Sequence, residues 1–192
     1  MELIIDRQLV YEEMDGRPVY YKNYHKVLLS LSTFQEIMGS RESQFVVISA
    51  ILKFLYRAVD DANYWIATNE AGLHISPGNN LAADIAIFNR STAPPRVRNF
   101  KYQDLPPEVV IEVDIKADTS EFSTPVEYYR QKSRKLRDFG VSKVVWVNTE
   151  ARSVMFNEDL APVSWDSPFE VLPGLTLTIG PLVREFVGGW EA

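Results

Sequence analysis

Hydrophobic residues alternate with other residues between positions 109 and 116, in the stretch VVIEVDIK. Side chains two positions apart on a β-strand share a face, so this pattern predicts a strand with one buried face. The other face carries charged side chains, namely Glu112, Asp114 and Lys116. The residues just before Glu112 are apolar on both faces, which is typical of a central strand whose polar end emerges at the sheet edge. The alternative is the solvated outer face of an edge strand.

Similar patterns predict strands and helices elsewhere. Strands are predicted at 3–21 with a turn at Asp15-Gly16, at 64–75 with a turn in the middle, and at 81–88, 141–147 and 148–156. Helices are predicted at 40–61 and 124–140, and a proline-rich loop at 89–107. Since strands and helices alternate in the second half, we expect an α/β fold with a central mixed sheet flanked by helices and an N-terminal β-rich extension. The 192 residues fit a single domain spanning 1–192.

The predicted helix at 124–140 turns one lysine inward. Thr124 suits its N-cap, Pro125 its first position and Gly140 its end. On a helical wheel, Lys132 lies within the apolar stripe formed by Tyr128, Leu136 and Phe139. The other cations of this helix fall on the opposite, solvated side together with Ser133. We therefore expect the Lys132 ammonium to meet buried carboxylates; the alternative is that its stem packs while the ammonium reaches water.

Asp84 is a carboxylate within a second apolar strand, AADIAIF. An unpaired buried carboxylate is unfavourable, and a divalent cation shared with Glu112 would remove that penalty. Oxygen ligands of this kind suit Mg²⁺ or Mn²⁺. We therefore expect Asp84 and Glu112 on neighbouring strands, with carboxylates close enough to share one cation. The loop at 89–107 is expected to be mobile and to rim this site.

Composition narrows the function classes. The net charge of −6, from 20 Lys and Arg against 26 Asp and Glu, argues against non-specific coating of nucleic acid. A nuclease is not excluded, because a bound metal supplies positive charge. The cations are also concentrated in two segments, 90–101 and 130–137, which could contact phosphates despite the negative net charge. The absence of cysteine excludes disulfides and zinc–thiolate sites. An early Asp6-Arg7 pair argues against a secretory signal, and no apolar run reaches the ~18 residues of a membrane span, so we expect a cytoplasmic protein.

Five stretches, in order, resemble the Uma-two family of restriction-endonuclease-like proteins. They are YEEMDG, AADIAIF, PPEVVIEV, KSRKLRDFGVSKVVWV and LPGL at 172–175. The second and third match the aspartate and glutamate strands of the PD-(D/E)XK nuclease superfamily, and the fourth matches a lysine-bearing helix followed by an aromatic strand. The resemblance covers most of the chain and implies a restriction-endonuclease-like fold.

The resemblance also implies roles for individual residues. Asp84 and Glu112 would hold the metal, with Asp114 as an auxiliary ligand. Lys132 would orient the attacking water or contact the scissile phosphate. Glu12, placed by YEEMDG, would bind a second metal or position Lys132.

A second interpretation makes Asp114-Ile115-Lys116 the working triplet, with Lys116 as the catalytic lysine. The chain also departs from the family at two positions. Ala83 stands where members have proline before the aspartate, which changes the entry to the strand. Gln44 stands where members often carry histidine, so a role for such a histidine does not carry over.

The expected activity is Mg²⁺- or Mn²⁺-dependent hydrolysis of DNA phosphodiester bonds, with the basic segments contacting backbone phosphates. One alternative is a nuclease fold that binds nucleic acid without cutting it. The other is a protein-interaction module that presents an acidic surface. The sequence does not distinguish DNA from RNA, and it leaves a homodimer open.

Overall fold

One mixed sheet of eight strands forms the centre of the computed structural model, which describes residues 6–98 and 100–188. Its strands are β1 (Val10–Met14), β2 (Arg17–Tyr20), β3 (Tyr64–Ser76), β4 (Asn79–Asn89), β5 (Val109–Val113), β6 (Lys143–Asn148), β7 (Ser153–Phe156) and β8 (Val163–Ser164). They follow the order β2-β1-β4-β5-β6-β7-β8, and β3 pairs with β4 off this path. The β5–β6 pair is parallel and the other pairs are antiparallel. A parallel pair needs a crossover, which helix α4 (Pro125–Phe139) supplies.

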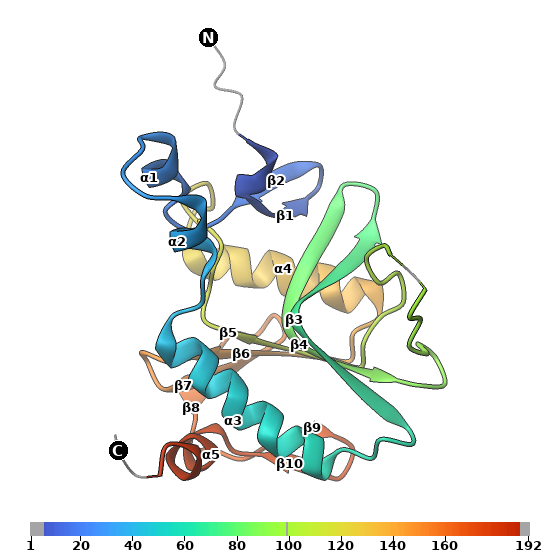
Figure 1. The fold of residues 1–192 in the computed structure, drawn as a ribbon. Coiled ribbons are helices and arrows are strands. Elements are labelled where there is room, and N and C mark those ends of the chain that lie inside the picture. The colour runs from blue at the N-terminus through green and yellow to red at the C-terminus, as the bar shows by residue number, and fades with distance from the viewer. Residues whose placement is uncertain (1–5, 99, 189–192) are drawn as a thin grey trace.

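Helices cover both faces of this sheet (Figure 1). Helix α4 lies on one face; α3 (Glu42–Ala58) and α5 (Ile179–Phe186) lie on the other, beside a small sheet of β9 (Phe169–Leu172) and β10 (Leu175–Leu177). Short helices precede α3, namely a 3-10 turn (Arg7–Leu9), α1 (Tyr24–Leu28) and α2 (Phe34–Met38). The predicted α/β fold with a central mixed sheet flanked by helices is confirmed.

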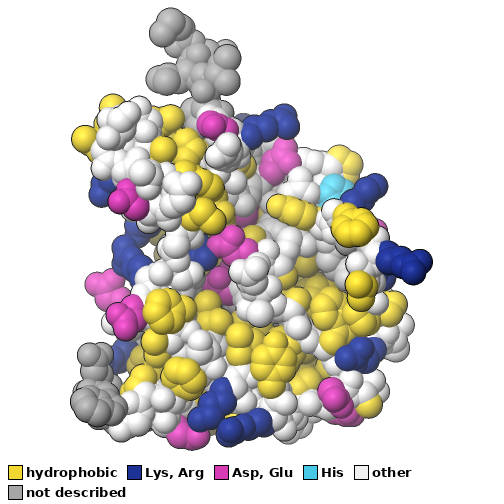
Figure 2. All heavy atoms as spheres, viewed as in Figure 1, with side chains coloured by type: hydrophobic (Ala, Val, Ile, Leu, Met, Phe, Trp, Pro, Cys, Tyr) yellow, Lys and Arg dark blue, Asp and Glu magenta, His cyan; other side chains and the backbone are white. Residues whose placement is uncertain are grey.

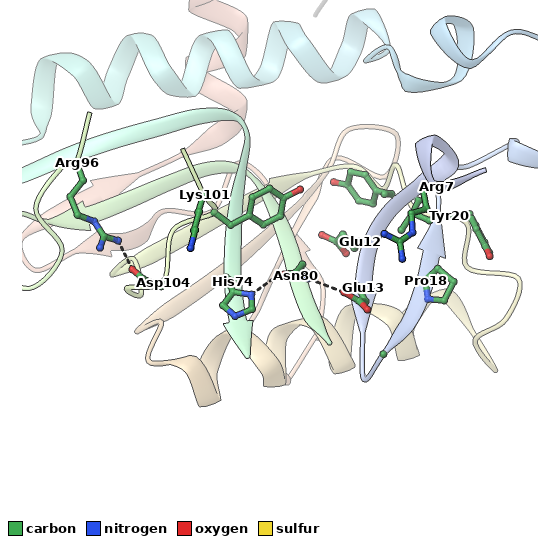
Figure 3. A pocket seen from close by; sticks show the side chains of 14 residues that line it. Arg7, Glu12, Glu13, Pro18, Tyr20, His74, Asn80, Arg96, Lys101 and Asp104 are labelled. Atoms are coloured by element: carbon green, nitrogen blue, oxygen red, sulfur yellow. Dashed lines mark hydrogen bonds and ion pairs between the residues drawn. The ribbon is translucent and has the colours of Figure 1, made fainter. Parts of the chain in front are cut away.

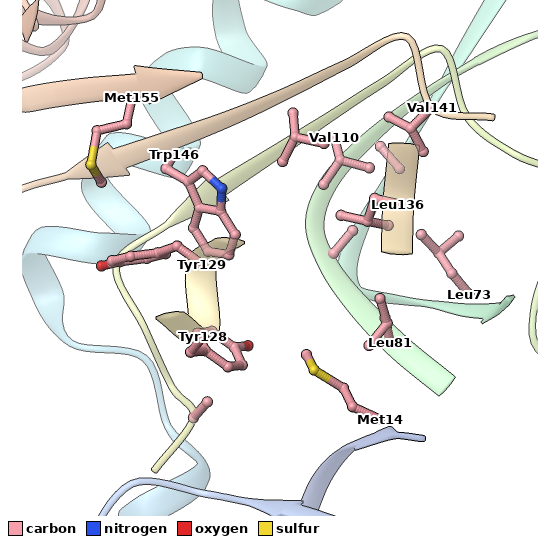
Figure 4. Close-up of a cluster of buried hydrophobic side chains, with 14 of the residues drawn as sticks. Met14, Leu73, Leu81, Val110, Tyr128, Tyr129, Leu136, Val141, Trp146 and Met155 are labelled. Atoms are coloured by element: carbon pink, nitrogen blue, oxygen red, sulfur yellow. The ribbon is translucent and has the colours of Figure 1, made fainter. Parts of the chain in front are cut away.

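Each face of the sheet has its own hydrophobic cluster. Beneath α4, Tyr128 and Leu136 pack with Val110 and Trp146 from the central strands (Figure 4). The other face buries side chains from α3 and the same strands, among them Val47, Ile51, Leu55, Ile85, Ile111 and Val145. Strands β4 and β5 therefore contribute to both clusters, which explains why their sequences are apolar on both faces.

The N-terminal hairpin forms with the predicted turn, but Arg7–Leu9, expected as strand, form a 3-10 helix. Strands β1 and β2 pair across a turn in which Asp15 and Gly16 both have positive φ angles. Glu13 of β1 pairs with Asn80 of β4, so the hairpin extends the main sheet. Residues 3–5 of the predicted strand lie outside the described residues.

Helix α4 begins and ends where the sequence predicts. The Thr124 side chain accepts a hydrogen bond from the Glu127 N–H, Pro125 occupies the first turn, and Gly140 has a φ of 118° at the C-terminal end. Ser133 was expected on the solvated side, and this was wrong, because it is fully buried. Its hydroxyl accepts a hydrogen bond from the Trp146 indole at 2.9 Å, so the buried face of α4 is wider than the apolar stripe alone.

Two other local predictions need correction. The turn expected within residues 64–75 does not form; β3 is continuous there, and an irregularity between Thr68 and Ala71 gives Asn69 and Glu70 positive φ angles. A β-bulge absorbs the one extra residue without reversing the chain. The chain reverses afterwards, where Gly78 has a φ of 78° between β3 and β4. On α3, the apolar spacing of the predicted helix at 40–61 places Phe45 among the residues facing the core, yet Phe45 is 49% exposed.

The segment between β4 and β5 contains no helix and no named strand over the residues that the structure describes there. A bridge between Leu73 and Gln103 attaches it to β3. This agrees with the predicted loop; its expected mobility stays a prediction. Across residues 6–98 and 100–188, no helix is long and apolar enough to cross a membrane.

Candidate active site

Asp84 and Glu112 lie on adjacent strands, as predicted. β4 and β5 are antiparallel, with Ile87 opposite Val109 and Ile85 opposite Ile111. Asp84 and Glu112 are the next residue on each strand beyond this last pair, so they lie at the same end of the paired segment. Both are buried, with 5% and 2% of their surface exposed.

The Asp84 carboxylate bridges the gap where β4 and β5 separate. Its Oδ2 accepts a hydrogen bond from the Val113 N–H at 2.8 Å and another from Gln44 Nε2 at 3.5 Å. Gln44 also donates to the Val113 carbonyl at 2.7 Å, which ties α3 to the end of β5. Burial raises the pKa of Asp84, whereas the Val113 hydrogen bond and the charges of Lys116 and Lys132 oppose this shift.

Lys132 enters the acidic cluster and does not reach solvent, as expected from the helical wheel. It is fully buried. Its Nζ donates to Glu12 Oε1 at 2.6 Å and to the Ala82 carbonyl at 2.8 Å, and lies 3.0 Å from Glu112 Oε1. Burial disfavours the charged form, but the two glutamates outweigh it and raise the pKa of Lys132 above its usual value. The rings of Tyr11, Tyr128 and Trp146 surround the ammonium within about 6 Å.

Glu12 is held from three sides. Its Oε1 accepts hydrogen bonds from Lys132 and from the Ala82 N–H at 2.9 Å, and its Oε2 accepts one from the Tyr128 hydroxyl at 2.8 Å. Burial and the nearby Glu12 charge raise the pKa of Tyr128 well above its usual range, so the hydroxyl stays a donor. Glu12 thus fixes Lys132 in place, which agrees with one of its two expected roles.

Glu112 is the least satisfied acid in the cluster. Its Oε1 is close to the Lys132 ammonium, yet no hydrogen-bond donor reaches it with suitable geometry from the described part of the chain. Burial raises the pKa of Glu112 to about 8; Lys132 opposes the shift, and the Asp84 and Glu12 charges add to it. Such an acid gains from any additional cation that enters the site.

The raised pKa of Glu112 predicts a loss of stability as the pH rises. The folded protein binds this proton up to about pH 8, whereas the unfolded chain releases it near the ordinary glutamate pKa of 4.5. The stabilisation is complete below the unfolded pKa and is lost as the pH rises through the folded pKa, with a slope of up to about 1.4 kcal/mol per pH unit. We expect urea denaturation in EDTA to show this slope between pH 5.5 and 8 for wild type, and a shallower one for Glu112→Gln. Glu185→Gln, at an exposed site, is the control, and parallel profiles for Glu112→Gln and wild type would contradict the shift.

Asp114 does not project beside Glu112, so the expectation that residues 112, 114 and 116 share a face was wrong. β5 ends at Val113, and Asp114 has a φ of 56°, which breaks the alternation of a strand. Both Asp114 oxygens accept hydrogen bonds from Thr149, one from its N–H and one from its hydroxyl. Within residues 6–98 and 100–188, no three His, Cys, Asp or Glu side chains form a group that could hold a metal ion. The expected role of Asp114 as an auxiliary ligand stays untested.

Lys116 lies on the more open side of the cluster. Its Nζ forms an ion pair with Glu70 Oε1 at 2.5 Å, and its side chain is 12% exposed, against 1% for Lys132. The charges of Lys116 and Lys132 both lower the pKa of Asp84. A cavity of about 640 Å³ is bordered by Gln44, Asp114 and Lys116 and opens on this side.

Sequence reasoning missed several members of the cluster. Tyr128 was assigned only to the apolar stripe, although its hydroxyl binds Glu12. Glu70 lies on the unpredicted bulge and is the partner of Lys116. A buried tyrosine needs a hydrogen-bond partner, which is the signal that could have identified Tyr128; the sequence holds no comparable signal for Glu70.

Comparison of the sequence with protein-family models and with curated proteins gives no match. The fold is similar to a crystal structure from Anabaena variabilis ATCC 29413 that is described as a "putative nuclease belonging to DUF820". The TM-score is 0.62 at 12% sequence identity, and the match covers 91% of this chain and 90% of the other. At this identity, the similarity shows that the two chains share a fold.

Proposed function

We propose that this protein is a metal-dependent endonuclease of the PD-(D/E)XK type that hydrolyses DNA phosphodiester bonds, and that it belongs with the Uma-two proteins. The observation that carries the proposal is the pair of buried carboxylates, Asp84 and Glu112, at the same end of two adjacent central strands. Buried acids need compensating charge or hydrogen bonds, and Glu112 Oε1 has no hydrogen-bond donor among the described residues. The shared fold with a chain described as a nuclease supports this reading.

The two acids fit Mg²⁺ or Mn²⁺. Mg²⁺ is usually held by one or two carboxylates and completes its shell with water and substrate phosphate, so a third acidic ligand is not required. Mn²⁺ accepts the same oxygen ligands. When bound, such an ion lowers the pKa of a coordinated water and stabilises charge on a phosphoryl group. Asp84 and Glu112 would hold it, and the raised pKa of Glu112 makes binding weaker at low pH, because a ligand carboxylate must be deprotonated.

The other residues of the cluster position these ligands and the substrate. Lys132 lies against Glu112, where it offsets the charge of this carboxylate once the proton is lost, and is itself fixed by Glu12. Gln44 holds the Asp84 carboxylate against the end of β5. Lys116, which is near Asp84 and partly exposed, is the ammonium able to approach a scissile phosphate or the attacking water.

Cleavage of supercoiled plasmid DNA tests the proposal. We expect nicking or linearisation with Mg²⁺ or Mn²⁺ and none with EDTA. Asp84→Asn preserves size and an acceptor for the Val113 N–H but removes the charge, and it should slow cleavage by at least about 100-fold. Asp166→Asn, at an exposed aspartate paired with Arg184, is the control and should cut like wild type. An Asp84→Asn variant with the wild-type rate would exclude a metal site at Asp84.

A second candidate is a nuclease fold that binds DNA without cutting it. The observation in its favour is the closed network around Lys132, whose ammonium is fully engaged by Glu12, Glu112 and the Ala82 carbonyl. Absence of cleavage in both metals, together with DNA affinity that falls steeply with salt, would support this candidate. Absence of both cleavage and DNA binding would leave the protein-interaction module. The cytoplasmic location and a homodimer stay predictions.

A further inference from the structure

A large cavity lies beside the acidic cluster, between the β1–β2 hairpin and the loop that follows β4. It has a volume of about 1160 Å³. Figure 3 shows His74 and Asn80 on its floor, Arg7 and Tyr20 on the hairpin side, and Lys101 on the loop side. Glu12 lies at its inner end, so the cavity leads toward the residues that hold Lys132.

The loop that borders this cavity carries large apolar side chains exposed to solvent, and of these Tyr102 lines the cavity itself. Phe100 is 95% exposed, Val97 is 94% exposed and Tyr102 is 54% exposed. Folded chains seldom leave a cluster of large apolar side chains uncovered unless it contacts a partner. Figure 2 shows hydrophobic side chains beside Lys and Arg side chains at the right-hand edge of this face.

Basic side chains are interleaved with these apolar ones. Residues 89–107 contain four cations, Arg90, Arg96, Arg98 and Lys101, against one acid, Asp104, in a chain whose net charge is −6. Arg96 is bound to Asp104 and Gln103, which places its guanidinium along the loop, and Arg98 is exposed. Cations that alternate with aromatic side chains suit a nucleic acid, whose phosphates bind the cations and whose bases stack on the rings. They do not suit an apolar peptide.

The tyrosine of this loop is held in place by β3. Gln103 donates to the Gly72 carbonyl at 2.9 Å and accepts from the His74 N–H at 2.8 Å. A Cβ atom at Gly72 would lie 2.7 Å from the Tyr102 ring, so the ring rests directly on the backbone where only glycine leaves room. Tyr102 is therefore a fixed platform with one face against the strand and half its surface open.

We propose that this loop and cavity bind an unpaired nucleotide of the nucleic-acid substrate, with Phe100 and Tyr102 stacking on bases and Arg98 contacting a phosphate. The inference rests on the proposed nuclease function and names the form of substrate that the site prefers. A base stacks on an aromatic side chain only after it leaves the duplex, so single-stranded DNA, or a duplex with an unpaired nucleotide beside the cut, fits better than continuous duplex. The cavity is large enough for one nucleotide.

Binding measured by fluorescence anisotropy in EDTA tests this inference without cleavage. The probes are a labelled single-stranded DNA oligonucleotide, the fully paired duplex of the same sequence, and that duplex with one unpaired nucleotide. We expect tighter binding of the first and third probes. Phe100→Ala and Tyr102→Ala should each raise their Kd by about tenfold and change the duplex Kd by less than about twofold. Gly72→Ala should resemble Tyr102→Ala, because it displaces the ring without removing it.

Tyr56→Ala is the matched control, since Tyr56 is an exposed aromatic residue on α3, outside the cavity. Its Kd values should equal those of wild type. Equal affinity for paired and unpaired probes, or equal losses on both in the loop variants, would overturn the inference while leaving duplex cleavage and the proposed function intact. Failure to bind any of the three probes would count against both. A dimer that dissociates on Phe100→Ala, seen by light scattering, would assign the loop to a second copy of the chain and overturn the inference.

Discussion

Lys132→Met is expected to lower the free energy of unfolding by about 3–5 kcal/mol, because removing one member of a buried ionic network leaves the others uncompensated. The ammonium contacts Glu12 at 2.6 Å and Glu112 at 3.0 Å, and the side chain is 1% exposed. Methionine keeps most of the stem, so the loss measures the charge and the hydrogen bonds more than the packing.

Urea denaturation at pH 7 in EDTA measures this loss. Lys135→Met on the same helix is the control, because its partner Asp15 is 71% exposed and exposed pairs contribute less than about 1 kcal/mol. The double variant with Glu12→Gln should recover part of the stability, since the unpaired charge of Glu12 is then absent. Mg²⁺ should also reduce the loss, because a bound cation replaces the missing charge. If Lys132→Met unfolds like Lys135→Met, the network does not stabilise the fold.

The inward position of Lys132 could be predicted from the sequence because helical periodicity fixes which side chains share a face. Its neighbours on the wheel are apolar, so a lysine among them must be buried or extend to water, and the choice depends on nearby acids. Asp84 and Glu112 were identifiable for a similar reason, since each is a carboxylate in a strand that is apolar on both faces. The periodicity of long helices and strands was thus enough to predict Asp84, Glu112 and Lys132 in the cluster.

The positions of the other residues in the cluster depend on places where regular secondary structure ends. Alternation along β5 placed Asp114 beside Glu112, but the positive φ of Asp114 turns its carboxylate to Thr149. The bulge in β3 brings Glu70 to Lys116, although the pattern there indicated a turn. Local backbone conformations of this kind are set by tertiary contacts and carry little signal in the hydrophobic pattern. The contact of Gln44 with Asp84 likewise joins residues 40 positions apart.

The two lysines of the cluster should separate when stability and cleavage are measured on the same variants. Lys116→Met is expected to slow DNA cleavage by about 100-fold or more and to lower the free energy of unfolding by only about 1 kcal/mol. Its partner Glu70 is 30% exposed, so water can solvate the carboxylate that is left behind. The ammonium that is lost is the more exposed of the two, and its charge acts on Asp84.

Single-turnover cleavage with Mg²⁺, combined with urea denaturation, distinguishes the two roles. Glu70→Gln is the control, since it releases Lys116 without removing its charge and should keep most of the activity. Lys132→Met should mainly lower the free energy of unfolding. Its cleavage rate should recover in part under conditions in which the variant is folded. If Lys116→Met cuts at the wild-type rate while folded Lys132→Met does not, the catalytic lysine is Lys132 and its buried ammonium must become accessible during turnover. The reverse result assigns Lys116 to the substrate and Lys132 to holding Glu112 in place, which is the division of roles that their exposure of 12% and 1% favours.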